Sequence, residues 1–411
     1  MSGQPRSVRL KDVSTYINRG VTPRYVVEAT GFMAFNQKCT RPDRTVDPTL
    51  GRPMLDPGPS AQLSILREGD LVVNSTGTGT LGRVGLIAHR HESDAALVAD
   101  GHVTVVRIDG AVAEPRFVWY YLSTDEFYEL ANATLAVGST NQTELGRSAL
   151  GGVSLCLPPL DEQRRIVDIL DTETARFDEL LRELNHLRVL AAEHVSAKRE
   201  WLFEASRAHG RPLTAFLQQQ PTYGVLVPRF EDYGVPFVRV GDIPAVARGE
   251  LPLRFISEEQ SREYRRTVLA EGDVVVSVVG SLTHSAVVPR SLVGANVARA
   301  VCMLRPAPGV PADLVSQFVQ TRLYQDQARL ATGSDTAQPT LNMSDLRKFA
   351  IPLPLGNEER MSMVRELKSV ESRATQLLLE LDRQSLLLRE HRQALITAAV
   401  TGGLDPARKV A

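Results

Sequence analysis

The chain has 411 residues, of which 43% are hydrophobic and 23% are charged, and its formal net charge is −1. This length allows two domains of ordinary size, and the composition is that of a soluble globular protein. No run of 18 apolar residues is present and the N-terminus has no apolar core, so neither a membrane span nor an export signal is expected, and a cytoplasmic location is predicted. The near-neutral charge excludes a uniformly basic protein, so a nucleic-acid surface would require local clustering of charge.

The first half of the chain, up to about residue 157, alternates short apolar runs with Gly, Pro, Asn and Thr. Apolar runs bounded by turn residues predict strands at 71–73, 84–87 and 103–106. An amphipathic stretch at 115–133 predicts one or two helices. This half is therefore expected to be an α+β domain with a small sheet.

A proline-containing segment at 157–164 (LPPLDEQR) then opens a long leucine-rich stretch. Prolines followed by acidic residues are typical of a helix N-terminus. Apolar residues recur at alternating intervals of three and four, which predicts a heptad seam that needs a partner helix. The residues expected to pair are Leu170, Phe177, Leu180, Leu184 and Leu187.

The second half of the chain repeats this order. Residues 271–276 (EGDVVV) correspond to 68–73 (EGDLVV), and 353–360 (LPLGNEER) correspond to 157–164. A period near 200 residues indicates a duplicated unit of one globular domain and one helix. The second copy is predicted to have strands at 237–240, 274–279 and 301–304, helical structure at 311–330, and a heptad seam containing Leu367, Leu377, Leu381 and Leu388.

Two matched seams in one chain favour pairing of the two helices with each other, and an antiparallel arrangement would give the pair a pseudo-two-fold axis. Each helix of roughly 40 residues would be on the order of 60 Å long, which suits a spacer between two half-sites on one DNA duplex. Core helices, or a coil that only dimerises the protein, are the alternatives. The predicted division is 1–157 and 209–353 for two globular domains, 158–208 and 354–402 for the helices, and 403–411 for a C-terminal tail.

Residues 74–83 (NSTGTGTLGR) contain a GxGxxG pattern after a predicted strand. A dinucleotide-binding loop needs a helix next, whereas a strand-like run follows. The pattern therefore favours a glycine-rich turn between strands, and such a turn can approach phosphates or base edges closely.

No catalytic or metal-binding set is predicted. The three cysteines, at positions 39, 156 and 302, form no CxxC motif, which excludes a zinc finger or a disulfide framework. Glu366 and Lys368 have the ExK spacing of nucleases, but they flank Leu367 of the predicted seam. His194 and His391 occupy matched seam positions, where polar layers or helix-end contacts are favoured over a metal pair.

Side chains that can contact bases cluster in the predicted turns of both halves. The turns differ between the halves while the strand and helix patterns agree, as expected of two readers with different half-sites. Taken alone, a residue of this kind in a turn is more often a solvated loop residue than a base contact. The candidate DNA-binding residues are Asn36, Gln37, Lys38, Asn74, Thr76, Thr78, Arg83, Thr140, Asn141 and Gln142 in the first half, and Arg239, Asp242, Ser281, Thr283, His284, Arg299, Asp335, Thr336 and Gln338 in the second.

The acidic helix starts also suggest a docking surface for a partner protein. Its candidate residues are Glu162, Gln163, Arg164, Glu358 and Arg360. A helix N-terminus alone explains the same residues, and the sequence does not separate the two explanations.

Across almost its whole length the chain resembles the specificity (S) subunit of type I restriction–modification systems. The resemblance rests on 157–164 and 353–360, the leucine-rich helices that follow them, the strand-and-turn segment 71–83, and 394–402 (ALITAAVTG). It implies two target-recognition domains, each reading one half of an asymmetric bipartite sequence in double-stranded DNA, joined by two antiparallel helices that set the spacing.

The resemblance also implies partners. Two methyltransferase subunits would bind the helices, and two motor-nuclease subunits would join for restriction. S-adenosylmethionine, ATP and magnesium would belong to those partners, so this chain is expected to be non-catalytic and to hold no cofactor. The alternatives are an interaction scaffold without DNA reading, which the neutral charge favours, and an enzyme that binds a nucleotide at the glycine-rich loop.

Overall fold

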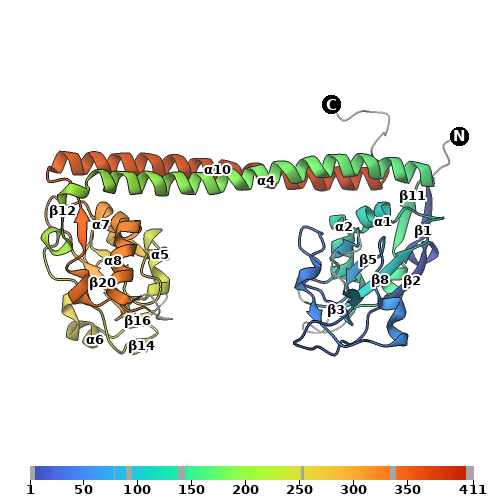
Figure 1. The fold of residues 1–411 in the computed structure, drawn as a ribbon, viewed down its shortest axis with the longest axis horizontal. Coiled ribbons are helices and arrows are strands. Elements are labelled where there is room, and N and C mark those ends of the chain that lie inside the picture. Colours follow the sequence, from blue (N-terminus) through green and yellow to red (C-terminus); the bar gives the residue numbers. More distant parts are fainter. Residues whose placement is uncertain are drawn as a thin grey trace. The chain divides into compact units, whose positions relative to one another are not determined.

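The computed structural model divides the chain into two compact units, and each unit contains part of both long helices (Figure 1). Unit 1 comprises residues 1–184 and 383–411, and unit 2 comprises 185–382. The long helices are α4 (Leu160–Ala205) and α10 (Asn357–Val400). The structure describes residues 5–77, 79–88, 95–137, 144–250, 254–333 and 339–403.

Unit 1 is built on a four-stranded antiparallel sheet. Its strand order is β2 (Ser14–Arg19), β8 (Val103–Ile108), β5 (Leu71–Asn74), β6 (Val84–Leu86). The helices α1 (Pro115–Leu122) and α2 (Asp125–Leu130) bury Phe117 and Phe127 in the core beside this sheet. The predicted strands and helices of the first half are therefore confirmed.

A second, smaller sheet in unit 1 has the order β4 (Arg52–Pro53), β3 (Phe32–Phe35), β7 (Ala96–Ala99). β3 and β7 are parallel, so their carboxyl ends lie at the same edge. The chain leaves β7 through a turn and returns as β8 of the main sheet, which joins the two sheets.

Unit 2 repeats both sheets. Its main sheet has the order β13 (Thr222–Tyr223), β20 (Val301–Leu304), β17 (Val274–Ser277), β18 (Ser285–Val287). Its second sheet has the order β14 (Phe230–Glu231), β16 (Phe255–Ile256), β15 (Val235–Val238), β19 (Asn296–Val297), and β15 and β19 are parallel. The predicted internal duplication and the α+β class are confirmed.

The strand pair that joins each domain to its helix is repeated, whereas the remaining elements differ between the two units. A short pair joins the domain to its helix, β1 (Arg6–Arg9) with β11 (Ser154–Leu157) in unit 1 and β12 (Gly210–Pro212) with β21 (Ala350–Pro352) in unit 2. Unit 1 also contains β9 (Ala136–Val137), β10 (Glu144–Leu145) and α3 (Arg147–Gly151). Unit 2 also contains α5 (Ile243–Ala247), α6 (Glu258–Glu263), α7 (Ala312–Val319), α8 (Arg322–Thr332) and α9 (Met343–Leu346).

Two features of the sheets are the same in both units. A Cβ atom on Gly20 would lie 1.9 Å from the carbonyl oxygen of Ala99, and one on Gly224 would lie 1.8 Å from that of Val297, so only glycine fits. A buried aspartate in the turn before the central strand pairs with an arginine of the neighbouring strand. The pairs are Asp70 with Arg107 at 2.7 Å and Asp273 with Arg305 at 2.6 Å.

Within each unit the two long helices run antiparallel. In unit 1, Asp178 of α4 pairs with Arg392 of α10 at 3.4 Å, and the first turns of α4 share a core with the last turns of α10. In unit 2, Arg188 pairs with Asp382, and Lys198, further along α4, pairs with the earlier α10 residue Glu366. The mutual pairing expected from the two seams and the antiparallel direction that the resemblance implies are therefore present in each unit.

The pairing residues are only partly buried. Leu170, Leu367 and Leu381 are buried, and Phe177, Leu184 and Leu388 are half-buried. Leu180, Leu187 and Leu377 instead remain 44%, 43% and 44% exposed, contrary to the seam prediction. Two helices bury only a narrow stripe, and a strict heptad drifts around a straight helix, so part of the predicted seam faces outward.

Candidate nucleic-acid interface

In unit 1, four loops meet where strands of the two sheets end. They are residues 36–38 after β3, 75–77 and 79–83 after β5, 100–102 after β7, and the segment 144–145 that forms β10. The amide of Ser75 donates to the carbonyl of His102 at 2.9 Å, and the amide of Leu145 donates to that of Ser75 at 2.8 Å. We call this set of loops the loop edge of unit 1.

Side chains bind the same loops together. The Asn74 amide donates to the backbone carbonyl of Gln37 at 2.9 Å, and the Thr80 hydroxyl donates to the Gln37 side chain at 3.2 Å. The Thr76 hydroxyl lies 2.7 Å from Nδ1 of His102. Gly77 has a φ of 99°, and a Cβ there would lie 2.4 Å from Oε1 of Gln37, so this turn requires glycine.

Unit 2 has an equivalent loop edge, formed by residues 239–242 after β15, 278–284 after β17, 298–300 after β19, and 339–341. The amide of Val278 donates to the carbonyl of Ala300 at 2.9 Å, and the amide of Leu341 donates to that of Val278 at 2.8 Å. These bonds correspond one to one with those of Ser75 and Leu145. The backbone scaffold of the edge is therefore duplicated.

The side chains on the two edges differ in chemistry. Unit 1 presents Lys38 and His102 as exposed residues, with Gln37, Thr76 and Arg83 partly exposed. Unit 2 presents Arg299 and His284 as exposed residues. Arginine, lysine, histidine, glutamine and threonine supply the donors and acceptors that distinguish base pairs in the major groove. The two edges could therefore recognise different sequences.

The electrostatics of each edge are set by a few pairs. In unit 1, Arg19 pairs with Glu144 at 3.2 Å, and the guanidinium of Arg83 donates to the carbonyl of Gly79 at 2.7 Å. In unit 2, Nε and Nη2 of Arg239 donate to the two carboxylate oxygens of Asp242, at 2.9 and 3.0 Å. Burial raises the pKa of the Asp100 carboxyl, which accepts a hydrogen bond from the amide of His102 at 2.8 Å.

The structure brings most of the described candidate residues to these edges. Asn36, Gln37, Lys38, Thr76 and Arg83 lie on the unit 1 edge, and Arg239, Asp242, Ser281, Thr283, His284 and Arg299 lie on the unit 2 edge. Asn74 is the exception, because its side chain is fully buried and holds the Gln37 loop instead of facing solvent. Thr78, Thr140, Asn141, Gln142, Asp335, Thr336 and Gln338 lie outside the described residues.

His102 is not among the residues that the sequence pattern predicts for DNA binding. This residue follows Asp100 and Gly101, a pattern typical of a turn, and precedes the strand-like run at 103–106. That turn signal could have identified it. Its proximity to Thr76, 26 positions earlier, comes only from the sheet.

The proposed docking residues differ in exposure, and some of them have a structural role. Gln163 is 1% exposed and its side chain bonds to the amide of Glu114 and the carbonyl of Pro158, so it anchors α4 and is not part of a free surface. Arg360 donates to the carbonyls of Leu355 and Gly356 and closes the turn before α10. Glu162 pairs with Arg165, while Arg164 and Glu358 are exposed.

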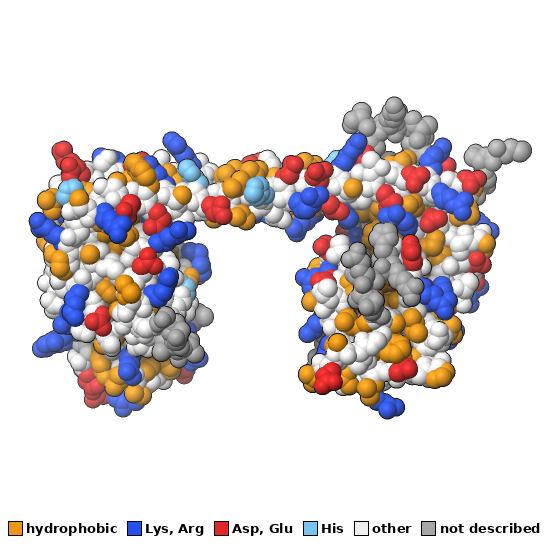
Figure 2. All heavy atoms as spheres, viewed as in Figure 1, with side chains coloured by type: hydrophobic (Ala, Val, Ile, Leu, Met, Phe, Trp, Pro, Cys, Tyr) orange, Lys and Arg blue, Asp and Glu red, His pale blue; other side chains and the backbone are white. Residues whose placement is uncertain are grey.

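Exposed apolar side chains also lie on the parts of the long helices that belong to each unit, among charged ones (Figure 2). Leu379 of unit 2 is 65% exposed and Leu386 of unit 1 is 57% exposed. The others are Leu180 and Leu387 in unit 1, and Leu187, Val189, Leu190 and Leu377 in unit 2. We call these eight residues the exposed leucine set.

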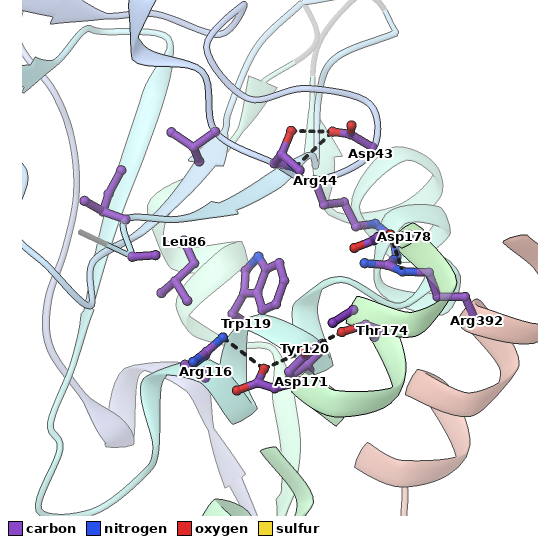
Figure 3. Close-up of a pocket in the computed structure, with 15 residues that line it drawn as sticks. Asp43, Arg44, Leu86, Arg116, Trp119, Tyr120, Asp171, Thr174, Asp178 and Arg392 are labelled. Atoms are coloured by element: carbon purple, nitrogen blue, oxygen red, sulfur yellow. Dashed lines mark hydrogen bonds and ion pairs between the residues drawn. The ribbon is translucent and has the colours of Figure 1, made fainter. Parts of the chain in front are cut away.

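Unit 1 also contains a cavity of about 640 Å³ between its sheet domain and the helices (Figure 3). Its lining arginines are matched by acids. Arg116 pairs with Asp171 at 2.9 Å, and Arg392 pairs with Asp178. Tyr120 adds a hydrogen bond of 2.8 Å to Asp171. Because these charges are paired with one another, the cavity wall acts chiefly as a contact between domain and helix.

The structure gives little support to the alternatives to DNA binding. The glycine-rich loop leads into strand β6 and so has no helix N-terminus on which a dinucleotide pyrophosphate would lie. Glu366 and Lys368 form ion pairs with Lys198 and Asp313. His391 packs edge-on against Phe177, and within the described ranges no three His, Cys, Asp or Glu side chains are grouped for a metal ion.

None of the described helices is long and apolar enough to cross a membrane.

Comparisons with known proteins agree with these features. Residues 55–187 match the type I restriction modification DNA specificity domain. The chain is 25% identical over 319 residues to the specificity subunit of the type I restriction enzyme EcoBI from Escherichia coli, a match that covers 70% of this chain and 65% of the relative, just under two thirds of its length.

Two solved structures share the fold over nearly the whole chain. One comes from work on complex assembly and conformational transition of the type I R-M system, with a TM-score of 0.67, 18% identity, and 98% of each chain covered. The other is the HsdS subunit from Thermoanaerobacter tengcongensis, with a TM-score of 0.52 and 19% identity, covering 98% of this chain and 97% of that one.

Proposed function

Because the chain belongs to the specificity subunits of type I restriction–modification systems, we propose that its two units read the two halves of a bipartite DNA target. The observation that carries this proposal is the pair of loop edges. Both are held by the same main-chain hydrogen bonds, yet they present different side chains. A duplicated scaffold with different exposed groups is what reading two unlike half-sites requires.

The near-neutral net charge is compatible with DNA binding of this kind. Arg19 and Arg239 near the edges are paired with the acids Glu144 and Asp242, which offsets part of the positive charge that would attract phosphates. Affinity would then depend on base contacts and on partner subunits that supply additional positive charge.

We further propose that this chain is a non-catalytic scaffold. Methyl transfer, ATP hydrolysis and cleavage would be carried out by methyltransferase and restriction subunits, which would bind S-adenosylmethionine, ATP and magnesium. Within each unit, the members of the exposed leucine set offer apolar side chains to a helical partner, because exposed apolar residues on a helix with a charged surround are typical of helix-to-helix docking. This surface is a better docking candidate than the helix N-termini.

DNA reading is tested by methylome sequencing of cells with and without this chain, and with residues 1–157 exchanged for those of another member of the family. The chain should be required for methylation of one bipartite sequence, and the exchange should alter one half-site while the other stays the same. Joint alteration of both half-sites would contradict independent reading by the two units. Methylation that persists without the chain, together with no salt-sensitive duplex binding in gel shifts, would favour a scaffold without DNA reading.

Scaffolding is tested with Leu379→Glu and Leu386→Glu. These residues are exposed, and glutamate is a good helix former, so the free energy of unfolding should change by less than about 0.5 kcal/mol. Co-purification with the methyltransferase subunits should fall at least tenfold. Val27→Glu is the matched control, since Val27 is fully exposed in a loop of unit 1, away from the helices. Equal co-purification of all three variants would exclude the exposed leucine set as the docking surface.

A further inference from the structure

One turn has the same place in both loop edges and carries a different exposed side chain in each. In unit 1 it spans Asp100 to Val103, closed by a hydrogen bond of 3.0 Å from the amide of Val103 to the carbonyl of Asp100. In unit 2 it spans Ala298 to Val301, closed by the same bond at 2.9 Å. We propose that His102 and Arg299, the exposed residues of these two turns, each contact a base in their own half-site and determine its identity.

The backbone of each turn is held by a closely packed glycine and by a main-chain hydrogen bond to a neighbouring strand. Gly20 lies against the carbonyls of Ala99 and Asp100, and Gly224 lies against those of Val297 and Ala298, so closely that no side chain fits. The amide of Asp100 donates to the carbonyl of Phe35 at 3.0 Å, and the amide of Ala298 donates to that of Val238 at 2.9 Å. A turn held in this way presents its side chain from a rigid base, which reduces the entropy lost on binding.

The imidazole of His102 is oriented by its neighbour. Its Nδ1 atom lies 2.7 Å from the Thr76 hydroxyl, and the residue is exposed, so Nε2 is left for a ligand. When the hydroxyl donates to Nδ1, the ring proton lies on Nε2, which then donates to an acceptor. In the major groove the available acceptors are N7 and O6 of guanine, N7 of adenine and O4 of thymine.

The guanidinium of Arg299 has no ion pair or side-chain hydrogen bond among the described residues, unlike nearby Arg239, which is bound by Asp242. A free guanidinium keeps its full set of donors for a bidentate contact, and guanine is the base that accepts such a pair through O6 and N7. The inferred preference of this turn is therefore a guanine in the half-site read by unit 2.

This inference rests on the proposed function, and the test separates the two. The complete complex with methyltransferase subunits is prepared with the wild-type chain, His102→Ala, Arg299→Ala and, as a control, Arg262→Ala. Arg262 is an exposed arginine of α6 that pairs with Glu258 and lies outside both loop edges. Methylation is then measured on a library in which each position of the wild-type target is varied singly.

His102→Ala should lower discrimination at one position of one half-site on the order of tenfold to hundredfold, and Arg299→Ala should do so at one position of the other. Arg262→Ala should leave every position unchanged. Thr76→Val, which removes the contact to Nδ1, should weaken discrimination at the same position as His102→Ala and at no other. Thermal unfolding of each variant excludes loss of fold as the cause.

Unchanged discrimination by His102→Ala and Arg299→Ala would overturn the inference while the wild-type result still supports DNA reading. Weaker binding that is uniform over all library members, with a smaller salt dependence, would also overturn it, because that pattern marks phosphate contacts. A wild-type complex that methylates without sequence preference would contradict the proposed function itself.

Discussion

The two units have the same interior and different surfaces. The pairs Asp70–Arg107 and Asp273–Arg305 occupy equivalent strands with nearly equal geometry. The contacts between domain and helix differ, since Tyr120 bonds to Asp171 and Thr174 while Gln317, 197 positions later, bonds to Glu371 and Arg199. The Asp–Arg pairs are constrained because their charges are buried among crowded backbone. The contacts between domain and helix lie at a junction where several side-chain pairs can fit.

The loop edges extend this comparison to function. Their main-chain hydrogen bonds are retained, so the positions from which side chains project are retained as well. The exposed residue differs in chemistry and in its place in the turn, since His102 is the third residue of the Asp100–Val103 turn and Arg299 is the second residue of the Ala298–Val301 turn. Recognition can thus vary without a cost to the fold.

The largest expected effect concerns the crowded glycines. Gly20→Ala should destabilise unit 1 by more than about 3 kcal/mol, because the new Cβ would lie 1.9 Å from a carbonyl oxygen and the backbone would have to move. Gly224→Ala should do the same to unit 2. Hydrogen exchange resolved to peptides of each main sheet measures the effect unit by unit. Gly146→Ala, with open space around it, is the control, and equal loss of protection in all three variants would contradict the crowding argument.

The next effect concerns the buried ion pairs. Arg107→Met leaves Asp70, whose side chain is 1% exposed, without its cation, and should cost about 3–5 kcal/mol. Arg305→Met should cost somewhat less, since Arg305 is 28% exposed against 16% for Arg107. Urea unfolding monitored in each unit provides the measurement. The exposed pair Arg262–Glu258 is the control, and Arg262→Ala should change the free energy of unfolding by less than about 0.5 kcal/mol.

The smallest expected effect is a pH dependence of stability that only the unit 1 turn, which contains Asp100, should show. Burial raises the pKa of Asp100, so the folded state holds this proton more tightly than the unfolded chain, whose aspartates titrate near pH ~3.9. The free energy of unfolding of unit 1 should therefore fall as pH rises from that value through the folded pKa. Asp100→Asn keeps an acceptor for the amide of His102 and should remove this decline.

Urea unfolding of wild type and Asp100→Asn at several pH values measures the difference. Unit 2 supplies an internal comparison, because Ala298 occupies the equivalent position and has no titrating group. An identical pH dependence for the two proteins in unit 1 would show that Asp100 is not the group responsible.

The sequence alone determined the duplication, the main strands and the long helices. Repeated motifs and apolar periodicity are local signals, and they locate β5, β17, α4 and α10 to within a few residues. The heptad pattern also predicted that the two helices pair with each other, although it could not tell which leucines two helices bury and which they leave exposed.

Only the tertiary structure decided which polar residues share a surface. Asn74 and Gln163 looked available in the sequence, but the fold buries both and uses them to hold a loop and a helix start. His102 gained its place beside Thr76 from the strand pairing of β5 with β8. The physical reason is that burial and proximity depend on hydrogen bonds between segments far apart in the chain, which local patterns do not encode.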